Sequence, residues 1–167
     1  MEPIWSGALV RISQKWPLKE YLHFKSSRSA AAIEELRVDL ETICALEEMS
    51  APMAKKAGRL ILCERAFRYG LSFEPQSNFD AISSNVFFNF MLIHGGFALT
   101  REGRLEISNR WIEVVHSFRE VVSTVEADAT PATLSQELIR FARQWGEHST
   151  NGGYKKHPFF VQAWSGF

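Results

Sequence analysis

Two carboxylates four residues apart are the pair in this chain whose type and spacing best fit site chemistry. Glu35 and Asp39 lie in Glu34-Glu35-Leu36-Arg37-Val38-Asp39-Leu40, inside a run of helical periodicity from Ser29 to Met49. Side chains four apart project from one face of a helix, where like charges repel. A cation over the pair would relieve that repulsion. Three interpretations follow, namely a metal site, a buried ion-pair hub and a solvated helix face.

The solvated face is the simplest of the three. Arg37 can pair along the helix with Glu34 and with Glu41. Such helical ion pairs stabilise by about 0.3–0.5 kcal/mol each, so they require no burial and no special role. The alternatives are a metal site and a buried carboxylate that grips a partner.

The motif and the elements that follow it resemble the C-terminal half of dipeptidyl peptidase III-type zinc metallopeptidases. That family carries Glu-Glu-x-Arg-x-Asp/Glu on a helix, matched here by Glu34, Glu35, Arg37 and Asp39. The likeness covers about residues 29–143 and continues through a buried helix, a β-hairpin and a further helix. The resemblance implies that Glu35 corresponds to a zinc ligand and Asp39 to a carboxylate behind it.

The chain departs from that family in its histidines. The family's other zinc ligands come from a His-Glu-x-x-x-His pattern, which is absent here. The histidines are scattered, at His23, His94, His116, His148 and His157. Hydrolytic zinc needs three protein ligands and an open position for water. The missing ligands therefore come from another polypeptide, or the fold has lost the chemistry, or the chain is a piece of a larger protein. A composite site of Glu35 with His116, His148 or His157 is a weaker alternative.

The pattern along the chain predicts a mainly α single domain over residues 1–167, with five helices and one small β-hairpin. We expect helices at 30–49, 52–69, 79–94, 109–125 and 131–145, the hairpin at about 97–108, an irregular segment at 1–28 and an aromatic tail at 147–167. Within 1–28 a short strand at 8–12 and a short helix at 18–24 are expected. No charge occurs from Ala81 to Ile93, a pattern typical of a central, buried helix.

Residues that favour helix starts precede most of these helices. Because Ser, Thr, Asn and Asp side chains accept hydrogen bonds from the first free N–H groups, they predict N-caps. The predicted starts are Ser29, Asn78 or Asp80, Ser108 or Asn109, and Thr130 ahead of Pro131.

Asn85, Asn89 and His94 are polar residues on the otherwise apolar helix 79–94. Buried amides need hydrogen-bond partners, so the simpler interpretation is that they bind neighbouring backbone. The alternative is that the three residues line a pocket for an apolar or aromatic small molecule.

The C-terminal tail is rich in aromatic residues, at Phe159, Phe160, Trp164 and Phe167. If exposed, these residues would form a protein interface, because aromatic anchors dominate such surfaces. The simpler interpretation is that the tail packs over its own core.

Charge and composition exclude several classes of protein. The 19 basic and 19 acidic residues cancel, which argues against nucleic acid as the main partner and leaves self-association plausible. The two cysteines, Cys44 and Cys63, do not make a disulfide scaffold and are expected as reduced, buried thiols. No signal-peptide pattern and no apolar run of about 20 residues is evident, so we expect a cytoplasmic protein without a membrane partner.

Three functional hypotheses follow. The first is a binding or assembly protein built on a metallopeptidase-like helical domain, without independent hydrolytic activity and without a cofactor, whose partner is another protein chain or a second copy. The alternative is a metal-dependent hydrolase, or a subunit of one, with zinc held by Glu35 and with Asp39 nearby. The second alternative is a helical small-molecule-binding protein that uses Asn85, Asn89 and His94.

Overall fold

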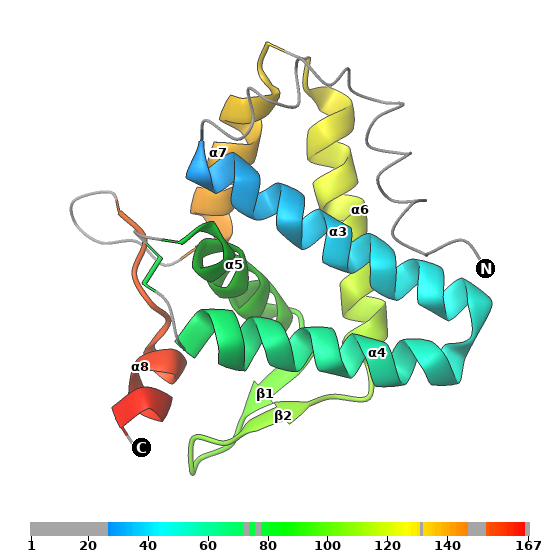
Figure 1. Cartoon of the computed structure of the whole chain (residues 1–167), viewed down its shortest axis with the longest axis vertical. Coiled ribbons are helices and arrows are strands. Elements are labelled where there is room, and N and C mark those ends of the chain that lie inside the picture. Colours follow the sequence, from blue (N-terminus) through cyan, green and yellow to red (C-terminus); the bar gives the residue numbers. More distant parts are fainter. Residues whose placement is uncertain (1–26, 72–73, 76–77, 131, 147–152, 166–167) are drawn as a thin grey trace.

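The computed structural model describes residues 27–71, 74–75, 78–130, 132–146 and 153–165, and it is mainly helical with one two-stranded antiparallel sheet (Figure 1). The elements are α3 (Arg28–Met49), α4 (Ala51–Cys63), the π-helical turn η1 (Glu64–Gly70), α5 (Phe79–Ile93), β1 (Phe97–Leu99), β2 (Leu105–Ile107), α6 (Trp111–Asp128), α7 (Leu134–Trp145) and α8 (Pro158–Ser165). The mainly α fold, the five predicted helices and the hairpin are confirmed, and α8 inside the predicted tail is an addition. The strand expected at 8–12 and the helix expected at 18–24 lie outside the described residues.

The start of α3 differs from the prediction by two residues. Ser27, not Ser29, is the N-cap, because Ser27 keeps an extended backbone while its Oγ accepts from the backbone N–H of Ala30 at 3.4 Å. Ser29 lies inside the first turn, and its Oγ accepts a hydrogen bond from the Tyr154 hydroxyl at 2.9 Å. The serine that was predicted to cap the helix instead ties it to the C-terminal part of the chain.

Two other helices start later than predicted. α6 begins at Trp111, because Ser108 forms a turn in which its Oγ accepts from the backbone N–H of Arg110 at 3.1 Å. α7 begins at Leu134, because the hydroxyls of Thr130 and Thr133 lie 3.0 Å apart in a turn that precedes the helix. Local side-chain hydrogen bonds compete here with the helical backbone pattern.

α5 is the central helix, as its uncharged sequence predicted. It contacts α3, η1, α6, α7 and β1. Its buried residues are Ala81, Ile82, Ser83, Ser84, Asn85, Val86, Phe87, Phe88, Phe90 and Met91. Phe118 of α6 stacks on Phe90, with ring centroids 3.9 Å apart, and on Phe87 at 5.9 Å. Stacked aromatic pairs therefore anchor α6 to α5.

The hairpin pairs Phe97 with Ile107 and Leu99 with Leu105. Its turn needs a left-handed residue, which Gly103 supplies with φ +76°. Phe97 is buried against the rings of Phe87 and Phe88. The hairpin thus covers one end of the aromatic core.

The aromatic tail packs on the core of this same chain. The Phe160 side chain is 0% exposed, and its ring centroid lies 4.7 Å from that of Phe88. Phe159 is buried beside the same ring at 5.0 Å. The structure therefore places both residues in the core and not at a surface interface. The side chain of Trp164 and all of Phe167 lie outside the described residues.

Helix length and apolarity bear on the membrane prediction. Within the ranges given above, no helix is long and apolar enough to cross a bilayer.

A substitution at Gly70 tests whether the close contact between Gly70 and Phe160 holds the C-terminal tail on the core. A Cβ at Gly70 would lie 2.5 Å from Phe160 Cζ and under 3 Å from two further ring atoms. We predict that Gly70→Ala lowers the free energy of unfolding by about 1–3 kcal/mol, since a fully buried ring has no room to move. Urea denaturation followed by circular dichroism measures the change.

The matched control for this substitution is a double-mutant cycle with Phe160→Leu, which removes the ring atoms in question. The two substitutions should be strongly non-additive. Additive effects would show that Gly70 does not seat the tail.

Candidate functional site

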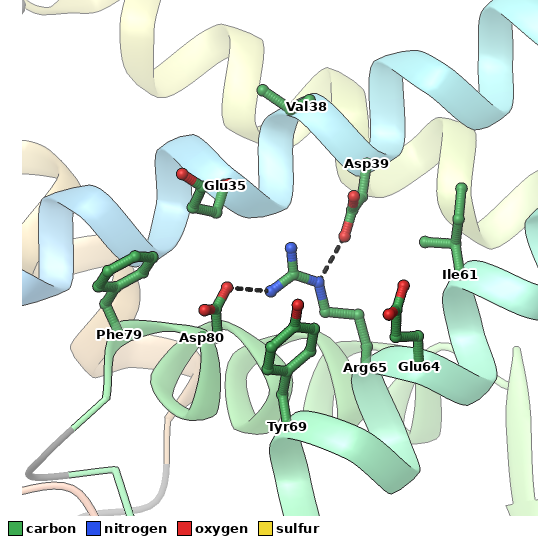
Figure 2. A pocket seen from close by; sticks show the side chains of 9 residues that line it. All are labelled: Glu35, Val38, Asp39, Ile61, Glu64, Arg65, Tyr69, Phe79 and Asp80. Carbon is green, nitrogen blue, oxygen red and sulfur yellow. Dashed lines mark hydrogen bonds and ion pairs between the residues drawn. The ribbon is translucent and has the colours of Figure 1, made fainter. Parts of the chain in front are cut away.

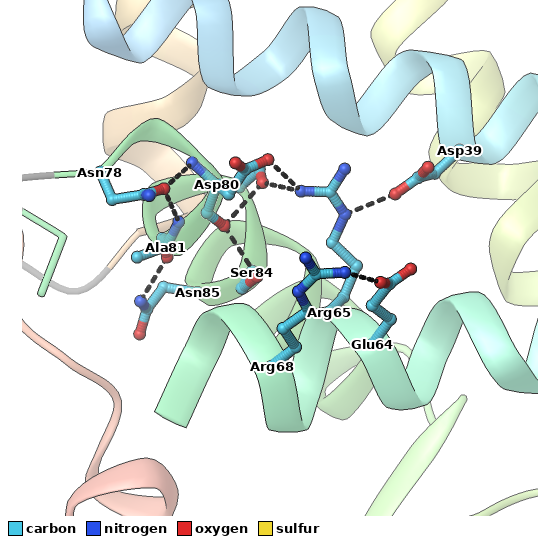
Figure 3. A network of polar contacts seen from close by, with 10 residues as sticks. Asp39, Glu64, Arg65, Arg68, Asn78, Asp80, Ala81, Ser84 and Asn85 are labelled. Atoms are coloured by element: carbon cyan, nitrogen blue, oxygen red, sulfur yellow. Dashed lines mark hydrogen bonds and ion pairs between the residues drawn. The ribbon is translucent and has the colours of Figure 1, made fainter. Parts of the chain in front are cut away.

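A buried arginine connects three helical elements. Arg65 of η1 is 6% exposed. Its Nε donates to Asp39 of α3, and its Nη1 donates to Asp80 at 3.0 Å and to Ser83 Oγ at 2.7 Å, both in α5 (Figure 3). Of the three interpretations of the carboxylate pair, the structure shows the ion-pair hub for Asp39. We call Arg65, Asp39, Asp80 and Ser83 the arginine hub.

The first turn of α5 is built to present Asp80 to the hub. Asn78, one of the two residues predicted for this position, is the N-cap. Its Oδ1 accepts from the backbone N–H groups of Asp80 at 2.7 Å and Ala81 at 3.2 Å. The Ser83 hydroxyl donates to the Asp80 carbonyl oxygen. The Ser84 hydroxyl donates to the same oxygen (Figure 3). A carboxylate in the first turn is also stabilised by the positive end of the helix dipole.

The π-helical turn places Arg65 and Ala66 side by side on the buried side of the chain. A π-turn inserts extra backbone into a helix and occurs often at functional sites. It also brings Tyr69 over the hub, with the Arg65 Cζ 5.1 Å from the Tyr69 ring centroid. This cation–π contact covers one side of the guanidinium.

Burial and the neighbouring charges shift the pKa values of Arg65 and Asp39 in the arginine hub. Burial lowers the pKa of Arg65, but Asp39 and Asp80 raise it by more, so the net pKa lies above its ordinary value and Arg65 is charged. Burial raises the pKa of the Asp39 carboxyl above its ordinary 3.8, against the opposing effect of Arg65. The Arg65 guanidinium therefore favours the ionised form of Asp39, which burial disfavours.

A cavity of about 300 Å³ opens beside the hub (Figure 2). Its lining residues are Glu35, Val38, Asp39, Ile61, Glu64, Arg65, Tyr69, Phe79 and Asp80. Four carboxylates thus face a single guanidinium, and an acidic cavity of this kind repels phosphates and carboxylates. Glu35 and Asp39 do share this cavity, as their spacing predicted.

The residues at this site do not fit the zinc that the metallopeptidase resemblance implies. The Asp39 carboxylate is bonded to Arg65. In the described part of the chain, no group of three His, Cys, Asp or Glu side chains is placed to hold a metal ion. His116 and His157 are absent from the lining of the cavity that holds Glu35, and His148 lies outside the described residues. The carboxylates that line the cavity are not grouped as zinc ligands would be, because Asp39 and Asp80 are paired with Arg65.

The predicted pocket residues of α5 bind backbone instead. Asn85 Nδ2 donates to the Ala81 carbonyl at 2.7 Å, and its Oδ1 accepts from the backbone N–H of His157 at the same distance. Asn89 Nδ2 donates to the Trp145 carbonyl at 2.8 Å. The amides therefore attach the tail and the end of α7 to the central helix.

The third predicted pocket residue, His94, differs from the two amides because its side chain is exposed. It stacks on the Phe90 ring at 4.1 Å, close to Trp145. Neither His94 nor the two amides lines the acidic cavity.

A second polar cluster joins α3 to α6. Cys44 Sγ lies 3.5 Å from His116 Nδ1, and His116 Nε2 bonds to Glu47. The order resembles a nucleophile, a base and an orienting acid. Cys44 is only 1% exposed, however, and burial raises its pKa to about 11, so it is a protonated core thiol. This cluster is an inter-helix contact, alongside the Arg37–Glu126 and Arg119–Glu41 ion pairs.

An exposed stripe runs along the outer side of α4 and η1. It consists of Met53, Lys56, Leu60, Cys63 and Phe67, all exposed and spaced alternately by three and four residues. We call these residues the α4 seam. Leu60 is 70% exposed, Met53 52% and Phe67 47%. The expectation that both cysteines are buried is wrong for Cys63, because it lies on this outer stripe while Ala54, Gly58 and Leu62 face the core.

Comparisons with known proteins identify no relative of this chain. No family model, no curated protein and no solved structure matches the chain.

Removal of the Arg65 guanidinium should destabilise the fold. We predict that Arg65→Met lowers the free energy of unfolding by about 3 kcal/mol near neutral pH, because Asp39 and Asp80 lose a buried partner. Without Arg65 the pKa of Asp39 rises further above its unfolded value. A carboxyl with a raised folded pKa contributes stability at low pH and loses that contribution as the pH rises. The deficit should therefore shrink at pH values near or below 4.

Urea denaturation of Arg65→Met across this pH range measures the effect. Arg110→Met is the control, since the Arg110–Glu113 pair is exposed and its loss should change stability by under about 0.5 kcal/mol. Equal effects of the two substitutions, or a deficit independent of pH, would contradict the buried hub.

The two thiols should differ sharply in reactivity. In native protein at about pH 8, iodoacetamide should modify the exposed Cys63 and leave Cys44 intact, because Cys44 is buried and its pKa is raised to about 11. Peptide mass spectrometry identifies the site, and Cys63→Ser should take up no label until urea unfolds it. Rapid native labelling of Cys44 would show that the Cys44–His116 contact is a reactive pair.

Proposed function

We propose that this chain is a binding or assembly protein without hydrolytic activity of its own, and that it binds a protein partner through the α4 seam. The single observation that carries the proposal is the exposed apolar stripe of Met53, Leu60 and Phe67 on α4 and η1. Alternating three- and four-residue spacing is the pattern by which one helix packs against another.

The arrangement of exposed apolar residues supports a binding role. Single exposed apolar side chains are ordinary on a protein surface. The seam gathers three large ones on one continuous helical segment, and Met49 at the nearby end of α3 is also exposed. Grouped apolar residues of this kind mark interaction surfaces.

The arginine hub supports the second part of the proposal. The carboxylate that the metallopeptidase resemblance places behind a zinc ligand is instead bonded to Arg65. Glu35 remains at the cavity as one carboxylate among four. Hydrolytic zinc needs three grouped protein ligands, and the described residues form no such group.

The two free thiols support a reducing compartment. Cys63 is exposed and Cys44 is buried. Exposed thiols persist best in the cytoplasm, which we therefore include in the proposal.

Photo-crosslinking from the seam tests this function. With benzoylphenylalanine in place of Phe67, living cells that make the protein should yield a discrete crosslinked species. The further substitution Leu60→Asp should abolish it, because a charge in the apolar stripe blocks helix packing. The control position is Leu99 in β1, which is also partly exposed but lies outside the seam. Gel electrophoresis and mass spectrometry identify the species.

Two outcomes would contradict the proposal. One is a crosslinking pattern that is the same from Phe67 and Leu99, or that is insensitive to Leu60→Asp. The other is chelator-sensitive peptide hydrolysis by the purified chain.

A further inference from the structure

We infer that the partner of the α4 seam is a second copy of this chain, packed antiparallel about a twofold axis at Leu60. The inference rests on the proposed function, since it requires that the seam binds protein. A twofold interface uses the same patch on both copies, so the patch must be complementary to itself. The α4 seam meets this requirement in its apolar residues, and its Lys56 is matched by Glu64, which flanks the seam.

The apolar residues match end to end. In an antiparallel pair centred on Leu60, residues equally far before and after it in sequence come to the same height. Leu60 of one copy then packs on Leu60 of the other. Met53 of one copy lies beside Phe67 of the other, since both are seven residues from Leu60. All three side chains are exposed in the single chain and become covered in the pair.

The charged residues match in the same register. Lys56 and Glu64 are each four residues from Leu60, on either side of it, and both are exposed. The antiparallel pair therefore places Lys56 of one copy at the height of the other copy's Glu64, and the twofold axis repeats this contact. A parallel pair would instead bring Lys56 to Lys56 and Glu64 to Glu64, which like charges disfavour. The contact between Lys56 and Glu64 thus favours the antiparallel direction over the parallel one.

Glu64 is free to make such a contact at little cost. Within the chain it pairs with Arg68 four residues on, and both side chains are largely exposed. Exposed pairs of this kind contribute little and exchange readily. The chain as a whole has no net charge, so two copies do not repel one another at long range.

Sedimentation equilibrium of the purified full chain tests the pairing. The wild-type chain should dimerise, and Leu60→Asp should be monomeric. Lys56→Glu should raise the dimer dissociation constant about 10-fold or more, because it places like charges together twice. The exchange Lys56→Glu with Glu64→Lys should restore dimerisation, since it reverses both partners. Circular dichroism confirms that each variant is folded.

Oxidative crosslinking is a second readout that does not depend on charge. Leu60→Cys in a Cys63→Ser background should form an intermolecular disulfide, because position 60 lies on the twofold axis. Cys63 of the wild-type chain should not form an intermolecular disulfide. The Cys63 residues of the two copies lie on opposite sides of the axis and would be about 9 Å apart along the helices. A parallel pair would crosslink through both positions.

Three results would overturn the inference. They are a monomeric wild-type chain at about 100 µM, well above the dissociation constants of stable dimers, a dimer crosslinked through Cys63, and a charge exchange that fails to restore association. If the Phe67 photoproduct contains a different protein while the purified chain is monomeric, the proposed function stands and the second copy is wrong. If no seam-dependent photoproduct forms, both fail.

Discussion

A guanidinium removed from water needs carboxylates around it, and Arg65 takes them from two separate helices. Asp39 of α3 and Asp80 of α5 must both reach the same side chain of η1, so the relative placement of three elements is constrained by one charge. The outer face of that same helical segment carries the α4 seam. The hub thus holds the seam in a fixed orientation, which a binding surface needs if it is to avoid an ordering cost on association.

Local patterns were sufficient to predict much of the framework. The uncharged run from Ala81 to Ile93 predicted the central helix, and Asn78 was one of the two residues predicted to cap it. The hub was not predictable in the same way. Arg65 is 26 residues from Asp39 in sequence, and an arginine in a helix is by default a surface residue. Nothing in the residues of η1 signals a π-turn.

The buried and exposed sides of α4 were also ambiguous in sequence, because both carry apolar residues. The structure shows that two of the three inward positions carry small residues, beside the buried Leu62. Ala54 and Gly58 face inward, and a Cβ at Gly58 would lie 2.4 Å from the Trp111 ring, so small residues allow close approach to the core. The larger Met53, Leu60 and Cys63 face outward. Apolar periodicity alone does not distinguish a face that covers its own core from one that covers a partner.

The tail has a consequence for the order in which the molecule can form. Phe160 fills space against Phe88 and Gly70, and the Tyr154 hydroxyl reaches back to Ser29 at the start of α3. Contacts of such long sequence separation form late, because a large loop must close first. During synthesis the Phe88 ring of the central helix is therefore fully covered only after Phe159 and Phe160 have been made. Until then the Phe88 ring is partly exposed and can bind other hydrophobic surfaces, including those of chaperones.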